Sequence, residues 1–159
     1  MDRLVEDILH RIETAQKLED LDGWIWKAGD LLAKVSYKEF QSGFAEIDRI
    51  TVRPEEAEMI KKGLLSALDR NQEPRFVQQI LGSLMMSHDP DLKPLFVSYL
   101  HQSLTQLKTW NALLSSALNG LSRVDENVYE GGSQSVADVD KTIRQADRYL
   151  QKLGKTAPW

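Results

Sequence analysis

Residues 73–124 read EPRFVQQILGSLMMSHDPDLKPLFVSYLHQSLTQLKTWNALLSSALNGLSRV, and their hydrophobic pattern indicates the fold class. Apolar residues recur in it at helical spacing in three successive runs, and the turn signal Asp89-Pro90 follows the first run. The first run, expected to point inward, consists of Phe76, Val77, Ile80, Leu81 and Leu84. The stretch therefore predicts helix, turn, helix, turn, helix. The first and third runs match at a constant offset, since Leu81 and Leu118 lie 37 positions apart (118 − 81). An offset of this size is typical of repeated helical hairpins.

The same pattern extends to the rest of the chain and predicts about eight helices and no strand. Asp2 can cap the first helix, and Pro54 and Pro74 each suit a first helical turn. Ser36, with Glu39 three residues later, fits a capping box and predicts a helix start. The residues expected to point inward from that helix are Phe40, Phe44 and Ile47, with Tyr37 as a further candidate. The expected helices pair along the chain as 3–16 with 20–35, 37–49 with 54–69, 74–87 with 91–107, and 110–124 with 136–153.

Short connections make neighbouring helices run antiparallel, and repeated hairpins stack into an α-solenoid. The sequence thus predicts an all-α, HEAT-like solenoid, with an irregular helical bundle as the alternative. A chain of 159 residues is about the size of one domain, so a single helical-repeat domain over 1–159 is expected.

The composition and the N-terminal residues predict which kinds of partner the protein has and where it is located in the cell. The net charge of −4 lacks the concentrated basic surface that phosphate binding needs, so no nucleic-acid partner is expected. There is no cysteine, and the first residues carry acids where a secretory signal would be basic and then apolar. No apolar run approaches the ~20 residues that span a bilayer. These features predict a cytoplasmic protein with no membrane contact.

No catalytic motif is present in the sequence. His10, His88 and His101 do not have the i, i+4 spacing of a helical zinc motif, and no serine stands in Gly-x-Ser-x-Gly. Carboxylate pairs are frequent but are expected on the solvated faces of helices. We therefore predict no catalytic, cofactor-binding or metal-binding residues and a non-enzymatic protein.

The longest predicted loop is acidic. Asp125, Glu126 and Glu130 stand beside Tyr129 in a segment without helical rhythm. A tyrosine among carboxylates suits an interface in which the carboxylates attract a basic partner and the tyrosine ring contacts it. The other interpretation is a solvated connection, with Tyr129 packed against the last hairpin.

The predicted helix 20–35 contains two tryptophans and two glycines. Trp24 and Trp26 are two residues apart, so they cannot both face the same core, and the outward one is a candidate anchor for a partner or a second copy. A large side chain that covers the end of the stack explains it equally well. Gly23 and Gly29 each cost stability inside a helix, which close approach of a neighbouring helix would explain.

Four segments in about the C-terminal half resemble small all-α immunity proteins of bacterial polymorphic toxin and contact-dependent inhibition systems: 89–96, 111–114, 125–129 and 146–150. The resemblance implies a cytosolic, non-enzymatic protein with HEAT-like helices. It also implies binding to a cognate toxin domain, often a basic nuclease, through an acidic concave face or loop.

Three hypotheses follow. An immunity protein predicts a one-to-one complex with a toxin encoded beside it, and a helical-repeat adaptor or scaffold predicts a cytosolic partner that is not toxic. An uncatalogued hydrolase or lyase needs a concave pocket with converging polar groups. The candidate partner-binding residues are Asp125, Glu126, Tyr129, Glu130 and Trp26, and the sequence does not determine the oligomeric state.

Overall fold

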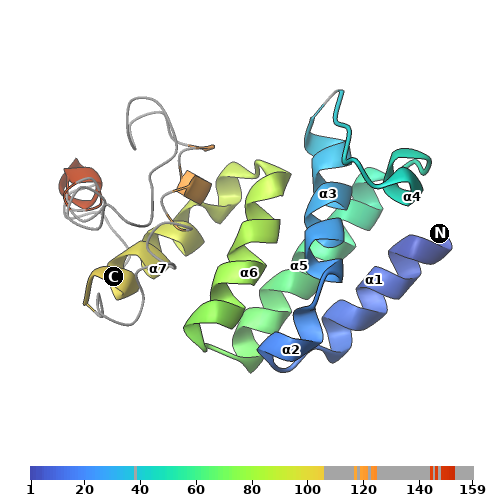
Figure 1. Cartoon of the computed structure of the whole chain (residues 1–159). Helices are drawn as coiled ribbons and strands as arrows, with labels where there is room; N and C mark the ends of the chain where they lie inside the picture. The colour runs from blue at the N-terminus through green and yellow to red at the C-terminus, as the bar shows by residue number, and fades with distance from the viewer. Residues whose placement is uncertain are drawn as a thin grey trace. The chain divides into compact units, whose positions relative to one another are not determined.

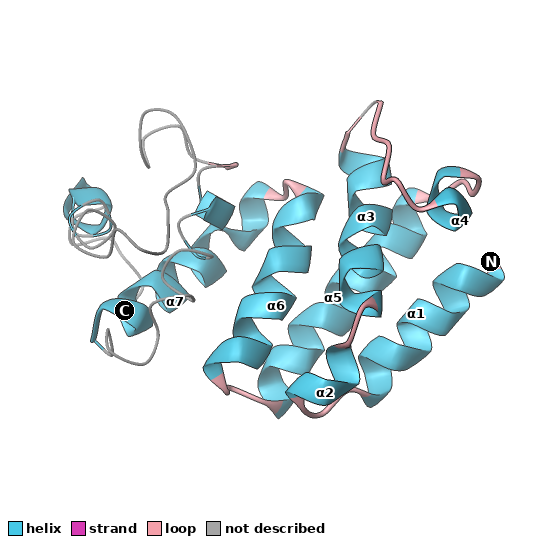
Figure 2. Cartoon of the chain, in the orientation of Figure 1, coloured by secondary structure: helices cyan, strands magenta, loops and turns pink. Residues whose placement is uncertain are grey.

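The computed structural model describes residues 1–37, 39–105, 117, 119–121, 123–124, 144, 146 and 148–152. It divides into two compact units, Met1–His88 and Asp89–Trp159, and each is described by itself. Every regular element among the described residues is helical, which confirms the all-α class for that part of the chain (Figure 2). The expectation of a single domain stays a prediction.

The first unit begins with α1 (Arg3–Thr14), as expected. The Asp2 side chain accepts a hydrogen bond from the Leu4 backbone N–H at 2.8 Å, which confirms Asp2 as the N-cap. One side of α1 is buried through Val5, Ile8, Leu9 and Ile12. The spacing of these residues is that of an amphipathic helix packed on a core.

The predicted helix 20–35 is two helices, α2 (Leu18–Leu21) and α3 (Trp24–Ser36). Asp22 takes a positive φ of 21°, and this interrupts the helical path between them. Gly23 is the N-cap of α3, and a Cβ there would meet nothing within 4 Å. The expectation that close packing explains Gly23 was therefore wrong.

The predicted helix 37–49 was wrong. Among its described residues, 37 and 39–49, only α4 (Ala45–Asp48) is helical, and Tyr37, the C-cap of α3, has extended backbone angles. Ser36 is the last residue of α3 and does not cap a new helix, because its hydroxyl donates to the Met86 carbonyl oxygen at 2.6 Å. Gly43, at φ +86°, lets the chain turn before α4.

The next helices are α5 (Pro54–Arg70) and α6 (Pro74–Leu84), each with its proline in the first turn as predicted. The Glu56 carboxylate accepts from the Arg53 backbone N–H at 3.2 Å and from Arg53 Nε at 2.9 Å, so the start of α5 is well capped. The hydrogen bond from the Arg53 side chain lowers the pKa of Glu56. One 3₁₀ turn, η1 (Met85–Ser87), continues α6.

The four long helices of the first unit form two antiparallel hairpins, α1 with α3 and α5 with α6 (Figure 1). Because 37–49 is not a helix, α5 pairs with α6 and not with the segment before it, which corrects the predicted pairing. The first helices of the two hairpins, α1 and α5, lie next to each other, and so do the second helices, α3 and α6. Arg70 Nε, at the end of α5, donates to the Ala15 carbonyl oxygen at 3.0 Å, so α1 and α5 run in the same direction.

Between these helices lies an apolar core. A Cβ on Gly63 of α5 would stand 2.8 Å from Ile12 Cγ2, which shows how closely α1 and α5 approach. The predicted inward residues of α6 are all fully buried. They are Phe76, Val77, Ile80, Leu81 and Leu84.

The second unit contains the 3₁₀ turn η2 (Pro90–Leu92) and α7 (Lys93–Thr105), within the predicted helix 91–107. A Cβ on Gly120 would overlap the Phe96 ring, so α7 packs directly on the helical residues 119–121. The described core of this unit is mainly apolar. It includes Phe96, Leu100, Ala117, Leu121, Ala146 and Tyr149.

Candidate functional site

The structure describes one of the five predicted partner-binding residues, Trp26. The others, Asp125, Glu126, Tyr129 and Glu130, lie outside the described residues. The site is therefore built around Trp26, within the first unit.

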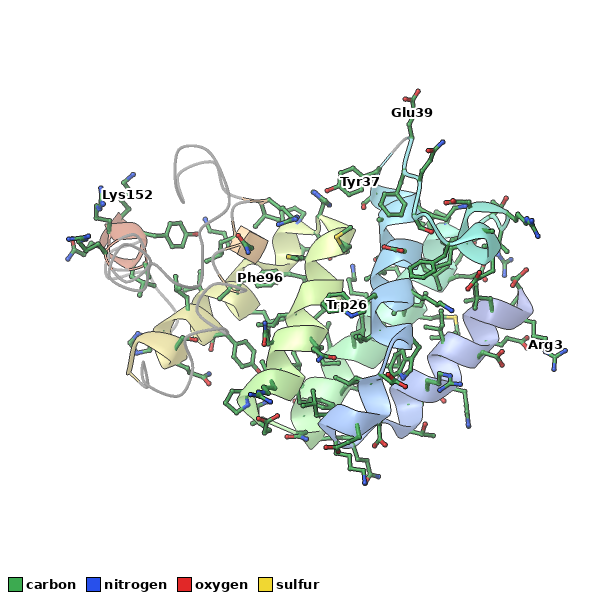
Figure 3. The ribbon with its side chains drawn as sticks, in the orientation of Figure 1. Arg3, Trp26, Tyr37, Glu39, Phe96 and Lys152 are labelled. Carbon is green, nitrogen blue, oxygen red and sulfur yellow. The ribbon has the colours of Figure 1, made fainter. Side chains whose placement is uncertain are left out.

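The two tryptophans of α3 face different surroundings, as the spacing predicts. Trp24 is 7% exposed, and its indole N–H donates to the Asp20 carbonyl oxygen at 2.5 Å. Trp26 is 52% exposed and lies on the α6 side of α3 (Figure 3). A Cβ on Gly82 would stand 3.5 Å from Trp26 Cζ3, so the indole rests on the backbone of α6. Trp26 is thus an exposed aromatic group with a fixed support.

That support is fixed by close packing of α3 on α6. The Ser83 hydroxyl, fully buried, donates to the Ile25 carbonyl oxygen at 2.6 Å. A Cβ on Gly29 would lie 3.3 Å from both Ser83 Cα and Met86 Cγ. Gly29 therefore allows the two helices to approach, as predicted for this glycine.

The two glycines at this contact should respond differently to alanine. Gly82→Ala should raise the free energy of unfolding by up to about 1 kcal/mol, because alanine favours a helix and its Cβ makes only ordinary contact. Gly29→Ala should not raise the free energy of unfolding, since its Cβ would come too close to the Ser83 backbone. Urea unfolding of both variants measures the difference. Equal gains at the two positions would contradict the described α3–α6 contact.

The segment after α3 is held against that helix by two lysines. Lys34 Nζ donates to the carbonyl oxygens of Ile47 and Ile50 at 2.8 and 2.6 Å, and to a third at residue 48. Lys27 Nζ pairs with Glu46 Oε1 at 2.8 Å and stands 5.4 Å from the centre of the Phe44 ring. Both ammonium groups are therefore engaged with the segment that carries α4.

Asp30 lies between these lysines on α3, one helical turn after Trp26. Its carboxyl group is partly buried, and it forms no hydrogen bond or ion pair with any residue that the structure describes. Burial raises the pKa of Asp30, and the nearby negative charge of Asp48 raises it further. Asp30 is thus a carboxylate in a setting that disfavours its own charge.

Removing this charge should stabilise the fold. Because the folded-state pKa of Asp30 is raised, ionisation disfavours folding, so Asp30→Asn should raise the urea midpoint at neutral pH. The gain should shrink as the pH falls through the raised pKa and vanish below the ordinary value of 3.8, where the wild-type carboxyl is also neutral. Asp7→Asn, at an exposed position on α1, is the matched control and should change little. A lower midpoint for Asp30→Asn at neutral pH would contradict this assignment.

At the end of α3, Tyr37 extends the aromatic surface. It is 38% exposed, and its hydroxyl lies 2.6 Å from His88 Nε2. The two rings meet edge to face at 4.3 Å between centroids. Figure 3 shows Tyr37 at the end of the helix that carries Trp26. We use the term Trp26 face for five residues, namely Trp26, Asp30, Tyr37, Phe44 and Asp48.

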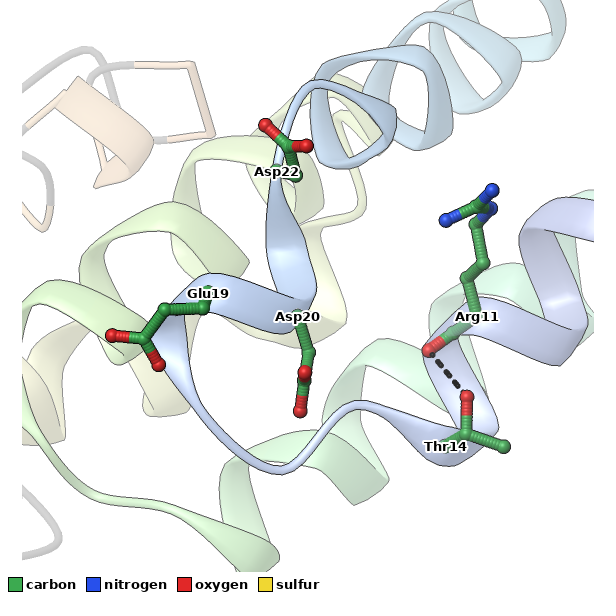
Figure 4. Close-up of a pocket in the computed structure, with 5 residues that line it drawn as sticks. All are labelled: Arg11, Thr14, Glu19, Asp20 and Asp22. Atoms are coloured by element: carbon green, nitrogen blue, oxygen red, sulfur yellow. Dashed lines mark hydrogen bonds between the residues drawn. The ribbon is translucent and has the colours of Figure 1, made fainter.

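A separate open hollow of about 330 Å³ lies between α1 and α2 (Figure 4). It is lined by Arg11, Thr14, Glu19, Asp20 and Asp22. The Asp20 carboxylate accepts from the backbone N–H groups of Gln16 and Lys17, at 3.0 and 3.2 Å, so this acid shapes the turn before α2. No group of three or more His, Cys, Asp or Glu able to hold a metal ion occurs among the described residues.

Trp26 was predicted from the sequence as a candidate site residue, whereas Asp30 and Phe44 were not. Asp30 follows Trp26 at i, i+4 spacing, which was the one readable signal. Phe44 was expected to point inward from a helix, yet it is 39% exposed. No helix in the described part of the chain is both long and apolar enough to cross a membrane. Comparison with family models, curated proteins and solved structures finds no match to this chain.

Proposed function

We propose that this chain is a non-enzymatic protein-binding module, and more specifically an immunity protein that binds and neutralises a cognate toxin in the cytoplasm. The observation that carries the proposal is Trp26, which is 52% exposed although its indole is supported by the backbone at Gly82. Tryptophan is enriched, with tyrosine and arginine, among the few residues that dominate binding energy at protein interfaces, and a rigid ring loses little entropy on binding. The toxin as partner is suggested by the family resemblance of the C-terminal half.

The proposed architecture is a HEAT-like row of hairpins, with an irregular bundle as its alternative. Equivalent buried residues of the first two hairpins lie 52 positions apart, as in Ile12 with Leu64 (64 − 12) and Ile25 with Val77 (77 − 25). The next offset in the sequence is 37, and the difference of 15 residues corresponds to an inserted segment before α5. This insertion includes α4 and Phe44, so it contributes to the Trp26 face.

The proposal is tested with the product of the gene beside this one. That product should be toxic when expressed alone, and growth should return when this chain is co-expressed. Size-exclusion chromatography with light scattering should give a one-to-one complex. A complex with a non-toxic neighbour would replace the immunity role by the adaptor role. Toxicity that persists despite co-expression, with no complex, would reject the immunity proposal.

The acidic segment around Tyr129 is proposed as a second contact. Reversing the charges of Asp125, Glu126 and Glu130 together should weaken partner binding and flatten its dependence on salt, because attraction of a basic partner is screened by ions. Far-UV circular dichroism should be unchanged. Affinity for the isolated partner at low and high salt measures the effect, and an unaltered affinity would exclude this segment from the interface.

A further inference from the structure

On the Trp26 face, one negative charge is left without a partner. Lys27 and Lys34 stand at i−3 and i+4 from Asp30, the positions from which a lysine ordinarily neutralises a helical carboxylate. Lys27 instead pairs with Glu46, and Lys34 binds backbone carbonyl oxygens around α4. Asp48, which is close enough to raise the pKa of Asp30, adds to the negative potential at this position.

An aromatic ring stands beside that charge. Trp26 and Asp30 are separated by one helical turn, so both belong to the side of α3 that is not packed into the core. The indole is supported on one side by Gly82, and about half of its surface is open to solvent. Ring and carboxylate thus stand on successive turns of one helix side, the spacing at which two helical side chains can contact the same group.

The protein already contains a filled pair of this kind a short distance away. Lys27 Nζ stands between the Phe44 ring, at 5.4 Å from its centre, and Glu46 Oε1, at 2.8 Å. A cation is therefore stabilised there by a ring and a carboxylate together. Trp26 and Asp30 offer the same two groups, with no cation between them among the described residues.

We infer that the Trp26 face binds an arginine side chain of the partner protein, with the guanidinium stacked on the Trp26 indole and paired with the Asp30 carboxylate. The inference rests on the proposed function and names the partner chemistry at the same surface. Arginine fits better than lysine, because its planar guanidinium stacks on an aromatic ring while its N–H groups reach a carboxylate. The guanidinium is also more weakly hydrated than an ammonium group, so its transfer from water to the interface costs less free energy.

The test uses the full chain and acetyl-arginine amide as the probe, followed by NMR. The indole N–H signal of Trp26, assigned by comparison with Trp26→Phe, should shift and saturate as the probe is added. The carboxyl titration of Asp30 should move to lower pH, because a bound guanidinium favours the charged form. Acetyl-citrulline amide has the same shape without the charge and should cause no saturable shift.

Matched variants separate this site from general attraction by an acidic protein. Asp30→Asn should weaken binding of acetyl-arginine amide about tenfold, whereas Asp7→Asn, which makes the same charge change on α1, should leave it unchanged. Equal responses to the arginine and citrulline probes, or equal affinities for the two Asn variants, would overturn the inference.

The outcomes also distinguish the inference from the proposed function. If the chain binds its native partner and Asp30→Asn does not weaken that complex, the arginine site is rejected while the binding module stands. If acetyl-arginine amide binds as described but no partner protein forms a complex, the site stands and the proposed function fails.

Discussion

Replacing Leu81 by alanine is expected to lower the free energy of unfolding by about 2–5 kcal/mol. Leu81 is fully buried in α6, a helix that packs against both α3 and α5, so the lost methyl groups leave a cavity that the neighbours cannot easily fill. Urea unfolding followed by circular dichroism measures the loss. Met59→Ala removes an apolar side chain that is 46% exposed on α5, and it should cost far less.

The same substitution at Leu118 tests the sequence repeat. Leu118 is 37 positions after Leu81 and lies outside the described residues, so its burial is a prediction from the offset alone. Leu118→Ala should cost about as much as Leu81→Ala if the two positions are equivalent. A negligible loss at Leu118 would show that the repeat alignment is misplaced, and a negligible loss at Leu81 would contradict the packing of α6.

Replacing Trp26 by alanine is expected to cost at least about 2 kcal/mol of binding to the native partner, or roughly thirtyfold in affinity. The stability of the free chain should change much less, because the indole is 52% exposed and covers only part of α6. Isothermal titration calorimetry with purified partner gives the affinity, and thermal unfolding gives the stability.

The matched control is again Met59→Ala, which removes an exposed apolar side chain on α5 that is not one of the five residues of the Trp26 face. It should leave the affinity unchanged. An equal loss for both variants would indicate a general hydrophobic contribution and not an anchor at Trp26. Full affinity with Trp26→Ala would remove Trp26 from the interface.

The predictions from sequence succeeded where a local signal sets the structure. Asp2, Pro54 and Pro74 each mark a helix start, and the structure places helices there because capping and proline geometry act within one turn. The burial of the α6 residues was also readable, since five apolar side chains follow the helical period. Helical propensity and the hydrophobic pattern agree in these segments.

The predictions were wrong where hydrogen bonds between residues distant in the sequence determine the local structure. Phe40, Phe44 and Ile47 have helical spacing, yet only Ile47 is fully buried, and their segment is held by Lys34, whose hydrogen bonds reach 13 to 16 residues along the chain. Ser36 bonds to a residue 50 positions away. The hydrophobic pattern of a short stretch of sequence predicts neither the Lys34 nor the Ser36 hydrogen bonds.

Contacts between residues distant in the sequence also explain why Asp30 was not predicted as a site residue. The exposure of Trp26 follows from its spacing to Trp24, which is local information. The unpaired state of Asp30 depends on where Lys27 and Lys34 direct their ammonium groups, and both turn toward the segment around α4. Because the sequence predicts a helix over 37–49, it gives no reason to expect that Lys27 and Lys34 turn away from Asp30.

We propose that the partner protein contacts the outward side of α3 and the segment that follows it. Hydrogen–deuterium exchange on the chain, with and without its native partner, measures this contact. Backbone amides of residues 24–37 and 39–50 should exchange more slowly in the complex. Unchanged exchange there, together with protection elsewhere in the chain, would contradict it.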